Sequence, residues 1–149
     1  RPEMASFDAG TMNWLHSVVF MNEPKFLELC GQEMRAAGVK PEIEVFDPGM
    51  IYDAGYYVKK GILKAPLHFQ FCMGCAGGID ATAEDLLFMR ATLEKVAPGS
   101  TWSAFGVVYK KGILAESNMQ LIARARRVIE EFGYEVATSQ EARAILSLS

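Results

Sequence analysis

The stretch Pro41-Glu-Ile-Glu-Val-Phe-Asp47 gives the clearest indication of the fold, because a short apolar run ends in a polar residue just before an expected helix. The stretches Pro2–Asp8 and Leu67–Met73 show the same order of apolar run, polar or glycine ending and helix. This order is typical of parallel strands whose carboxyl ends carry polar side chains, which is where barrel and open α/β enzymes place their chemistry. The sequence therefore predicts an α/β enzyme, or part of one.

Helices are predicted between these strands. One begins near Pro24 and stops at Gly38, because proline suits a first helical turn and glycine suits a helix end. A second begins at a capping-box pattern at Thr82 and breaks at Pro98. A fourth strand, Thr101–Phe105, follows directly. Four core strands are too few for a closed eight-stranded barrel.

Two more helices are predicted near the end of the sequence. A long amphipathic helix follows Ser117 and ends at Gly133. Its three arginines, Arg124, Arg126 and Arg127, are expected on the solvent side. After a short extended piece, a second capping box at Thr138 opens a terminal helix.

Composition indicates a soluble globular protein. The chain has 149 residues, of which 50% are hydrophobic, so residues 1–149 are expected to form a single α/β domain. A net charge of −3 with scattered Lys and Arg excludes a nucleic-acid partner, and no run approaches the ~18 apolar residues of a membrane span. No signal-peptide pattern is visible and three cysteines cannot all pair, so a cytoplasmic protein is expected.

Several further segments carry a resemblance to a known family. They occur in order along essentially the whole chain: Pro2–Ser6 with Asn13-Trp14, Pro41–Glu44 with Gly49-Met50, Pro66–Phe71 with Gly77-Gly78, Thr101-Trp102, Lys111–Asn118, and Ala137-Thr138 with Glu141-Ala142. In these segments the chain resembles the β-keto acid cleavage enzymes.

The resemblance implies a (β/α)₈ barrel of the TIM type, in which a zinc ion binds a β-keto acid and acetyl-CoA is the co-substrate. The products would be acetoacetate and a new acyl-CoA, and a Lewis acid suits a reaction that passes through an enolate. It also implies a homo-oligomer, since members tend to be tetramers. The four strands would correspond to about strands four to seven of the barrel, followed by C-terminal helices, so the chain is expected to form only a partial barrel.

Two blocks of the family pattern are absent from this sequence. The N-terminal part, whose His-x-His pair supplies two zinc ligands, would lie before Arg1. The second gap falls near Gly106–Val108, where the family continues with a stretch that holds the third zinc ligand, a catalytic Asp and an assisting Arg. We therefore expect no metal ligand, and no complete zinc site, within this chain.

Four residues remain as candidates for a site. The resemblance implies that the hydroxyl of Ser6 binds the keto acid; the alternative is a polar residue that merely ends a strand. It also matches Glu44 to an acid of the family, which makes Glu44 the expected catalytic residue. Glu42 alternates with Glu44 and shares its face of the strand, where buried charge is costly unless a partner compensates it. Asn13 is a candidate substrate contact or, equally, a turn amide.

The Cys72-Met-Gly-Cys75 spacing offers a weaker hypothesis of metal or redox chemistry. A structural zinc would need a second ligand pair and a redox motif would need a helix start after the strand, and neither is evident. His68 is interpreted as a histidine with satisfied hydrogen bonds rather than a ligand. The glycines at 74, 77 and 78 do not have dinucleotide-binding spacing and are expected to let the backbone turn sharply after the strand.

Three functions of different classes stay open at this point. The first is that the chain is part of a zinc-dependent β-keto acid cleavage enzyme. The second is an inactive shortened α/β protein with a binding or scaffolding role. The third is a metal-independent lyase or aldolase with Glu44 as acid and base. The first is favoured, because a partial barrel alone would expose unpaired sheet edges. The sequence does not identify the keto acid.

Overall fold

The computed structural model describes residues 2–106, 117–131 and 133–148. The chain divides into two compact units, Arg1–Gly106 and Val107–Ser149, and each is described by itself. Of the segment where the family pattern is expected to be interrupted, Gly106 belongs to the first unit, whereas Val107 and Val108 lie outside the described residues.

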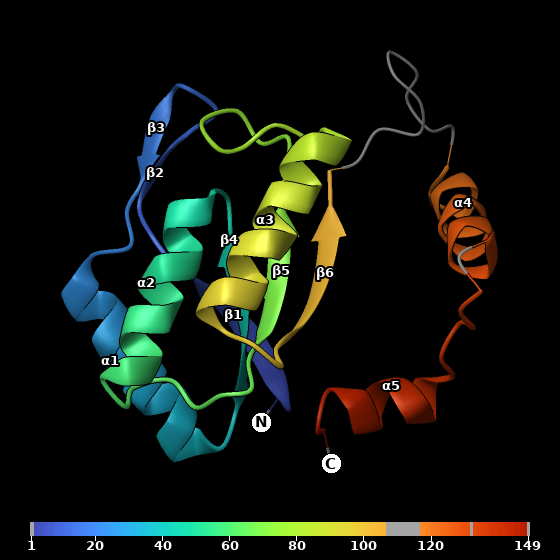
Figure 1. The fold of residues 1–149 in the computed structure, drawn as a ribbon. Coiled ribbons are helices and arrows are strands. Elements are labelled where there is room, and N and C mark those ends of the chain that lie inside the picture. The colour runs from blue at the N-terminus through green and yellow to red at the C-terminus, as the bar shows by residue number, and fades with distance from the viewer. Residues whose placement is uncertain (1, 107–116, 132, 149) are drawn as a thin grey trace. The chain divides into compact units, whose positions relative to one another are not determined.

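The first unit is built on a four-stranded parallel sheet with the order β1-β4-β5-β6 (Figure 1). The strands are β1 (Met4–Asp8), β4 (Lys40–Val45), β5 (His68–Cys72) and β6 (Thr101–Phe105). The helices α1 (Pro24–Ala37), α2 (Pro48–Lys59) and α3 (Ala83–Val96) connect them. All four predicted strands are therefore confirmed, and so is the predicted alternation of strands and helices.

The two faces of this sheet differ sharply in chemistry. One face is apolar and packs against the helices, with Phe7, Ile43, Val45, Phe69 and Phe71 at most 1% exposed. Helix side chains complete this core, among them Leu27, Ile51, Ala54, Met89 and Leu93. Removal of this apolar surface from water holds the helices on one side of the sheet and leaves the other side for polar residues.

The helix ends follow the local signals in the sequence. α1 starts with Pro24 and ends at Gly38, whose φ of 64° is left-handed. The side chain of Asp47 caps α2 by accepting a hydrogen bond from the Met50 amide at 3.1 Å. The Thr82 hydroxyl caps α3 in the same way, by accepting a hydrogen bond from the Asp85 amide at 3.1 Å. Both predicted boundaries of α1, and the predicted start of α3, are confirmed.

A β-hairpin that the sequence pattern did not indicate follows β1. Its strands are β2 (Met12–Trp14) and β3 (Val18–Phe20). The Trp14 ring packs edge-on against Phe46, just after β4, with ring centres 5.4 Å apart. The Asn22 side chain donates a hydrogen bond to the Gly10 carbonyl at 3.1 Å and so ties the two ends of the hairpin segment together.

The second unit contains α4 (Asn118–Glu131) and α5 (Ser139–Ile145). α4 confirms the predicted long helix, and Arg126 forms an ion pair with Glu130 on its surface. Thr138 and Glu141 form a complete capping box, in which each side chain bonds the other residue's backbone amide. The second predicted capping box is therefore confirmed.

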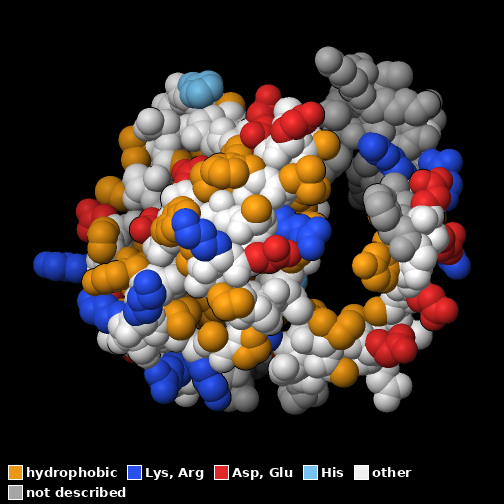
Figure 2. All heavy atoms as spheres, in the orientation of Figure 1, with side chains coloured by type: hydrophobic (Ala, Val, Ile, Leu, Met, Phe, Trp, Pro, Cys, Tyr) orange, Lys and Arg blue, Asp and Glu red, His pale blue; other side chains and the backbone are white. Residues whose placement is uncertain are grey.

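The outer face of the helices in the first unit carries a mixed surface. In Figure 2, apolar side chains on this face are interspersed with Lys and Arg and with Asp and Glu. Two lysines lie over tyrosine rings, Lys60 over Tyr56 at 5.7 Å and Lys95 over Tyr52 at 6.0 Å. Within the described part of the chain, no helix is long and apolar enough to cross a bilayer.

Candidate active site

Strand register gathers polar residues into two rows on the face of the sheet opposite the helices. Residues paired across neighbouring strands point to the same side. The first polar row runs through Ser6, Glu42, His68 and Thr101, and the second polar row runs through Asp8, Glu44, Gln70 and Ser103. The second polar row is nearer the carboxyl ends of the strands, where α/β enzymes hold their catalytic groups.

Asp8 and Glu44 form the acidic part of the second polar row. They are register partners on β1 and β4. Burial, and then the charge of Glu44, raise the pKa of Asp8 to about 6. Burial and Glu44 also raise the pKa of Glu42 in the first polar row. Three carboxyl groups on two adjacent strands thus concentrate negative charge on this part of the face, where a cationic group would be attracted.

The thiol of Cys72 extends this cluster onto β5. Cys72 is fully buried, and its Sγ donates to the Glu44 Oε2 at 3.6 Å. Burial, and secondly the charge of Glu44, raise the pKa of the Cys72 thiol. The thiol therefore stays protonated and acts as a weak hydrogen-bond donor to Glu44, rather than as a nucleophile.

His68 is held between hydroxyl groups on β6. Its Nδ1 lies 2.8 Å from the Thr101 Oγ1, and its Nε2 lies 3.2 Å from the Ser103 Oγ. The Ser103 hydroxyl donates in turn to the Gln70 Oε1. Burial, and then the charge of Lys40, lower the pKa of His68, so the ring is neutral at neutral pH. The structure is consistent with the interpretation of His68 as a histidine with satisfied hydrogen bonds.

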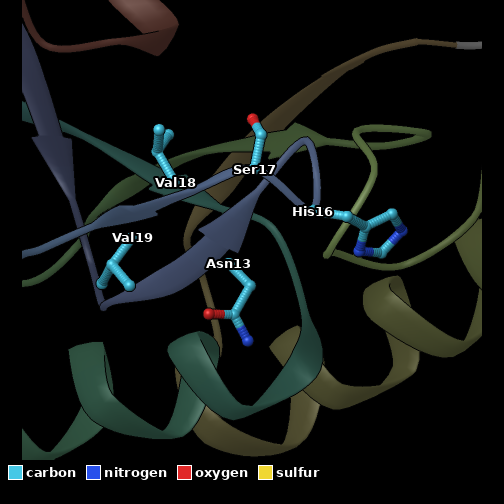
Figure 3. A pocket seen from close by; sticks show the side chains of 5 residues that line it. All are labelled: Asn13, His16, Ser17, Val18 and Val19. Atoms are coloured by element: carbon cyan, nitrogen blue, oxygen red, sulfur yellow. The ribbon is translucent and has the colours of Figure 1, made fainter.

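The predicted site residues fall in two places. Ser6 and Glu44 lie on the polar face of the main sheet, together with Glu42, as the alternation of residues predicted. Asn13 belongs to the separate two-stranded sheet of the hairpin. Asn13 and its register partner Val19 project from the same face of that hairpin (Figure 3).

The hairpin carries a surface pocket of about 330 Å³. Its lining comes from both hairpin strands and their turn: Asn13, His16, Ser17, Val18 and Val19. The turn holds two non-glycine residues, Leu15 and His16, at positive φ of 54° and 53°. Asn13 is exposed in this pocket and available to a bound molecule, whereas its role as a substrate contact stays a prediction.

The glycine-rich loop after β5 packs against the hairpin. Gly74 and Gly77 have φ of 72° and 98°, as expected for a sharp turn. A Cβ on Gly77 would lie 1.9 Å from the Asn13 carbonyl oxygen, and a Cβ on Gly78 would lie 2.6 Å from the Phe46 carbonyl oxygen. The Leu15 amide also donates to the Ala76 carbonyl at 2.9 Å. Close backbone approach thus accounts for the glycines at 77 and 78.

The residues that the structure describes do not fit a complete zinc site. Among them no group of three or more His, Cys, Asp and Glu side chains is placed to hold a metal ion. Cys72 and Cys75 are both free thiols, and Cys72 is directed to Glu44. A metal site formed within the described part of this chain, which the Cys-x-x-Cys spacing raised as a weaker hypothesis, therefore finds no support in the geometry.

Three residues of the second polar row were not identified from the sequence. They are Asp8, Gln70 and Ser103. The signal was present, because each stands two residues from another polar residue in its strand, and residues two apart share a face. The sequence prediction used this rule only for Glu42 and Glu44, which are both on β4. It therefore missed the residues of the second polar row on the other three strands.

A model of the β-keto acid cleavage enzyme family matches residues 1–110 and 106–148. The chain belongs to the β-keto acid cleavage enzyme family. The two matched segments meet at residues 106–110, which is where the sequence predicted an interruption of the family pattern.

Curated relatives in this family align with the whole chain. It is 40% identical to a 3-keto-5-aminohexanoate cleavage enzyme of Fusobacterium nucleatum, with 99% of this chain and 62% of the relative covered. It is 38% identical to the enzyme of that name from Acetoanaerobium sticklandii, with 100% and 63% covered. It is 33% identical to a 3-oxoadipate:acetyl-CoA acetyltransferase of Cupriavidus necator, with 99% and 61% covered. The chain thus spans about three-fifths of the length of these relatives.

Solved structures of ObcA share the fold. The apo structure superposes with a TM-score of 0.71 at 14% identity, covering 99% of this chain and 44% of ObcA. A ternary complex of ObcA with a C4-CoA adduct and oxalate gives a TM-score of 0.73 at 15% identity, covering 99% and 46%. The predicted fold class, an α/β partial barrel of the TIM type, is confirmed.

Proposed function

We propose that the protein cleaves a β-keto acid with acetyl-CoA and releases acetoacetate and a new acyl-CoA. The observation that carries this proposal is the position of Glu44 in the second polar row, at the carboxyl end of β4, beside Asp8 and one row from Ser6. Membership of the family and the names of the relatives support the same reaction. Because the chain spans three-fifths of those relatives, the activity is proposed for the complete protein.

In this proposal Glu44 is the catalytic acid and base. A carbon between a keto group and a carboxylate loses a proton readily, and Glu44 accepts it. The resulting carbanion attacks the acetyl thioester, CoA is transferred to the substrate's keto carbon, and the bond between that carbon and the α-carbon breaks. The acetoacetate carbanion that leaves takes back the proton. The Ser6 hydroxyl donates a hydrogen bond to the keto acid, and Asn13 contacts the substrate from the hairpin.

Only the family resemblance implies that the complete protein binds zinc. When bound, it would supply Lewis-acid polarisation of the substrate. Since the described residues do not form a three-ligand group, we propose that its ligands are residues other than these. No step assigned to Glu44, Ser6 or Asn13 is routed through it.

The acidity of the polar face favours a substrate with a cationic end. Asp8, Glu42 and Glu44 lie on two adjacent strands, and burial keeps their charges poorly screened. An amino-substituted keto acid would be attracted there, whereas a second carboxylate would be repelled. We therefore propose a 3-keto-5-aminohexanoate-like substrate ahead of 3-oxoadipate, the two chemistries that the relatives' names offer. A cytoplasmic homo-oligomer, such as a tetramer, completes the proposal.

The test is an assay of the complete protein against a panel of β-keto acids with acetyl-CoA, in which acetoacetate and the new acyl-CoA are both measured. We expect both products in equal amounts, with activity lost on chelation and restored by zinc. Cleavage that survives a chelator and needs no acetyl-CoA would indicate the metal-independent lyase instead. Absence of turnover with tight ligand binding would indicate the binding or scaffolding protein.

A further inference from the structure

The hydrogen bonds around Ser103 fix the direction in which protons are donated. A serine hydroxyl has one proton and can donate only one hydrogen bond. Ser103 gives that proton to the Gln70 Oε1, so it must accept from the His68 Nε2, 3.2 Å away. The neutral His68 ring then carries its proton on Nε2, and its Nδ1 accepts from the Thr101 hydroxyl at 2.8 Å.

Two charged side chains on β4 support this direction. The Glu42 Oε1 lies 3.9 Å from the His68 Nε2, and a carboxylate favours the tautomer with the proton on the near nitrogen. Lys40, on the same face of β4, opposes a second proton on the ring. The reverse chain, in which Ser103 donates to Nε2, would turn a nitrogen lone pair toward the Glu42 carboxylate.

This series of hydrogen bonds determines the orientation of the Gln70 amide. Its Oε1 is engaged by Ser103, so its Nε2 points away from β6. Within the described ranges of the chain, that amide nitrogen has no hydrogen-bond partner, and no buried side-chain nitrogen or oxygen there is unsatisfied. The two N–H groups of Gln70 are therefore accessible donors on the polar face.

The position of these donors relative to Glu44 suggests their use. Gln70 is the register partner of Glu44, and it is half-buried in the second polar row. We infer that Gln70 is a catalytic residue whose amide N–H groups bind the keto oxygen of the β-keto acid and stabilise it as that oxygen becomes an enolate. This inference rests on the proposed function.

The chemistry matches the arrangement of a base beside a donor. When Glu44 removes the α-proton, the electron pair of the C–H bond moves onto the adjacent keto oxygen. A donor that is already oriented, in a half-buried site, stabilises that charge without having to reorganise. The anchoring of Gln70 through Ser103 and His68 supplies this orientation, so Ser103 is a positioning residue for Gln70.

The experiment compares Gln70→Met with wild type in the complete protein, since methionine keeps the length of the side chain and removes its N–H donors. We expect kcat to fall about 10²–10³-fold, as for other oxyanion donors, while KM changes only a few-fold. Exchange of the substrate's α-protons with D₂O in the absence of acetyl-CoA should slow by a similar factor, because it requires the same enolate.

Two further variants separate catalysis from folding. Ser103→Ala keeps the Gln70 amide but removes its anchor, and we expect an intermediate loss in kcat. Gln32→Met replaces an exposed amide on α1 and should leave kcat and KM unchanged. Circular dichroism and a thermal melt check that each variant is folded.

The outcomes distinguish this inference from the proposed function. A folded Gln70→Met variant with a kcat within about threefold of wild type, or with its loss confined to KM, overturns the role of Gln70 and leaves the proposed function standing. If the wild-type protein cleaves no β-keto acid, the proposed function fails and this inference fails with it.

Discussion

Asp8 on β1 and Glu44 on β4 are register partners, so their carboxyl groups share one face of the sheet at the carboxyl ends of two adjacent strands. Burial, and then this relationship, explain why the pKa of Asp8 is raised to about 6. It also sets the electrostatic character of the candidate site, because the charge of Glu44 opposes the ionisation of Asp8.

Asp8→Asn should stabilise the protein in a pH-dependent way. The pKa of Asp8 is about 6 in the folded protein against 3.8 as its ordinary value, so the folded state binds this proton more tightly. Stability from this group is present at low pH and is lost as the pH rises through 6. Relative to wild type, Asp8→Asn should add about 1 kcal/mol to the free energy of unfolding at pH 8, allowing for solvent screening, and nothing near pH 3.

Urea denaturation at several pH values measures this effect. Asp80→Asn is the matched control, because Asp80 is exposed in the loop before α3. A gain for Asp8→Asn that is the same at pH 3 and pH 8 would show that Asp8 does not carry a raised pKa.

Glu44→Gln should abolish most of the proposed activity. The amide keeps the size and hydrogen-bonding capacity of the side chain but cannot accept the α-proton, so we expect kcat to fall about 10²–10⁴-fold. Glu42→Gln is the matched comparison, because Glu42 shares the strand and the face but lies in the first polar row. We expect it to cost less than tenfold.

Steady-state kinetics with acetyl-CoA and the best keto acid of the panel measure both variants. Equal losses for the two glutamates would assign the effect to the overall charge of the face. A larger loss for Glu42→Gln would move the catalytic role from Glu44 to Glu42.

Gly77→Ala should disrupt the contact between the glycine-rich loop and the hairpin. The new Cβ would lie 1.9 Å from the Asn13 carbonyl oxygen, and the φ of 98° is unfavourable for alanine. Gly99→Ala is the matched control, since its φ is 77° and none of the described atoms lies within 4 Å of its added Cβ. The control should cost about 1 kcal/mol for left-handed backbone, and Gly77→Ala about 2 kcal/mol more for the clash.

Chemical denaturation of both variants measures the difference. If Gly77→Ala costs no more than Gly99→Ala, the loop and the hairpin separate easily, and the contact through Asn13 is not a rigid part of the site.

Local signals in the sequence predicted most of the main sheet and its helices. The end of β1 at Asp8, and helix caps such as Asp47, Thr82 and Thr138, depend on neighbours in the chain, so a sequence pattern can report them. The hairpin was missed because its sequence carries no such local signal. Its strands have three residues each, and its turn uses Leu15 and His16 at positive φ in place of the glycine or asparagine that marks most hairpins.

The candidate site was predicted only in part. Ser6 and Glu44 came from the family resemblance, and alternation within one strand correctly placed Glu42 beside Glu44. Gln70 and Ser103 were missed because their importance depends on register between strands, which is fixed by packing of residues distant in sequence. The network that orients Gln70 is a property of two strands together.

The tautomer of His68 is the final prediction, and it tests the hydrogen-bond chain directly. The Ser103 proton goes to Gln70 and Glu42 lies 3.9 Å from the His68 Nε2, so the ring proton should reside on Nε2. Nitrogen-15 NMR at neutral pH distinguishes a protonated from an unprotonated ring nitrogen by its chemical shift. The His68 signals are assigned by their loss in His68→Gln and their persistence in His16→Gln. A proton on Nδ1 would mean that the chain runs in reverse, with Gln70 donating to Ser103, and the amide would then present its oxygen, not its N–H groups, to the substrate.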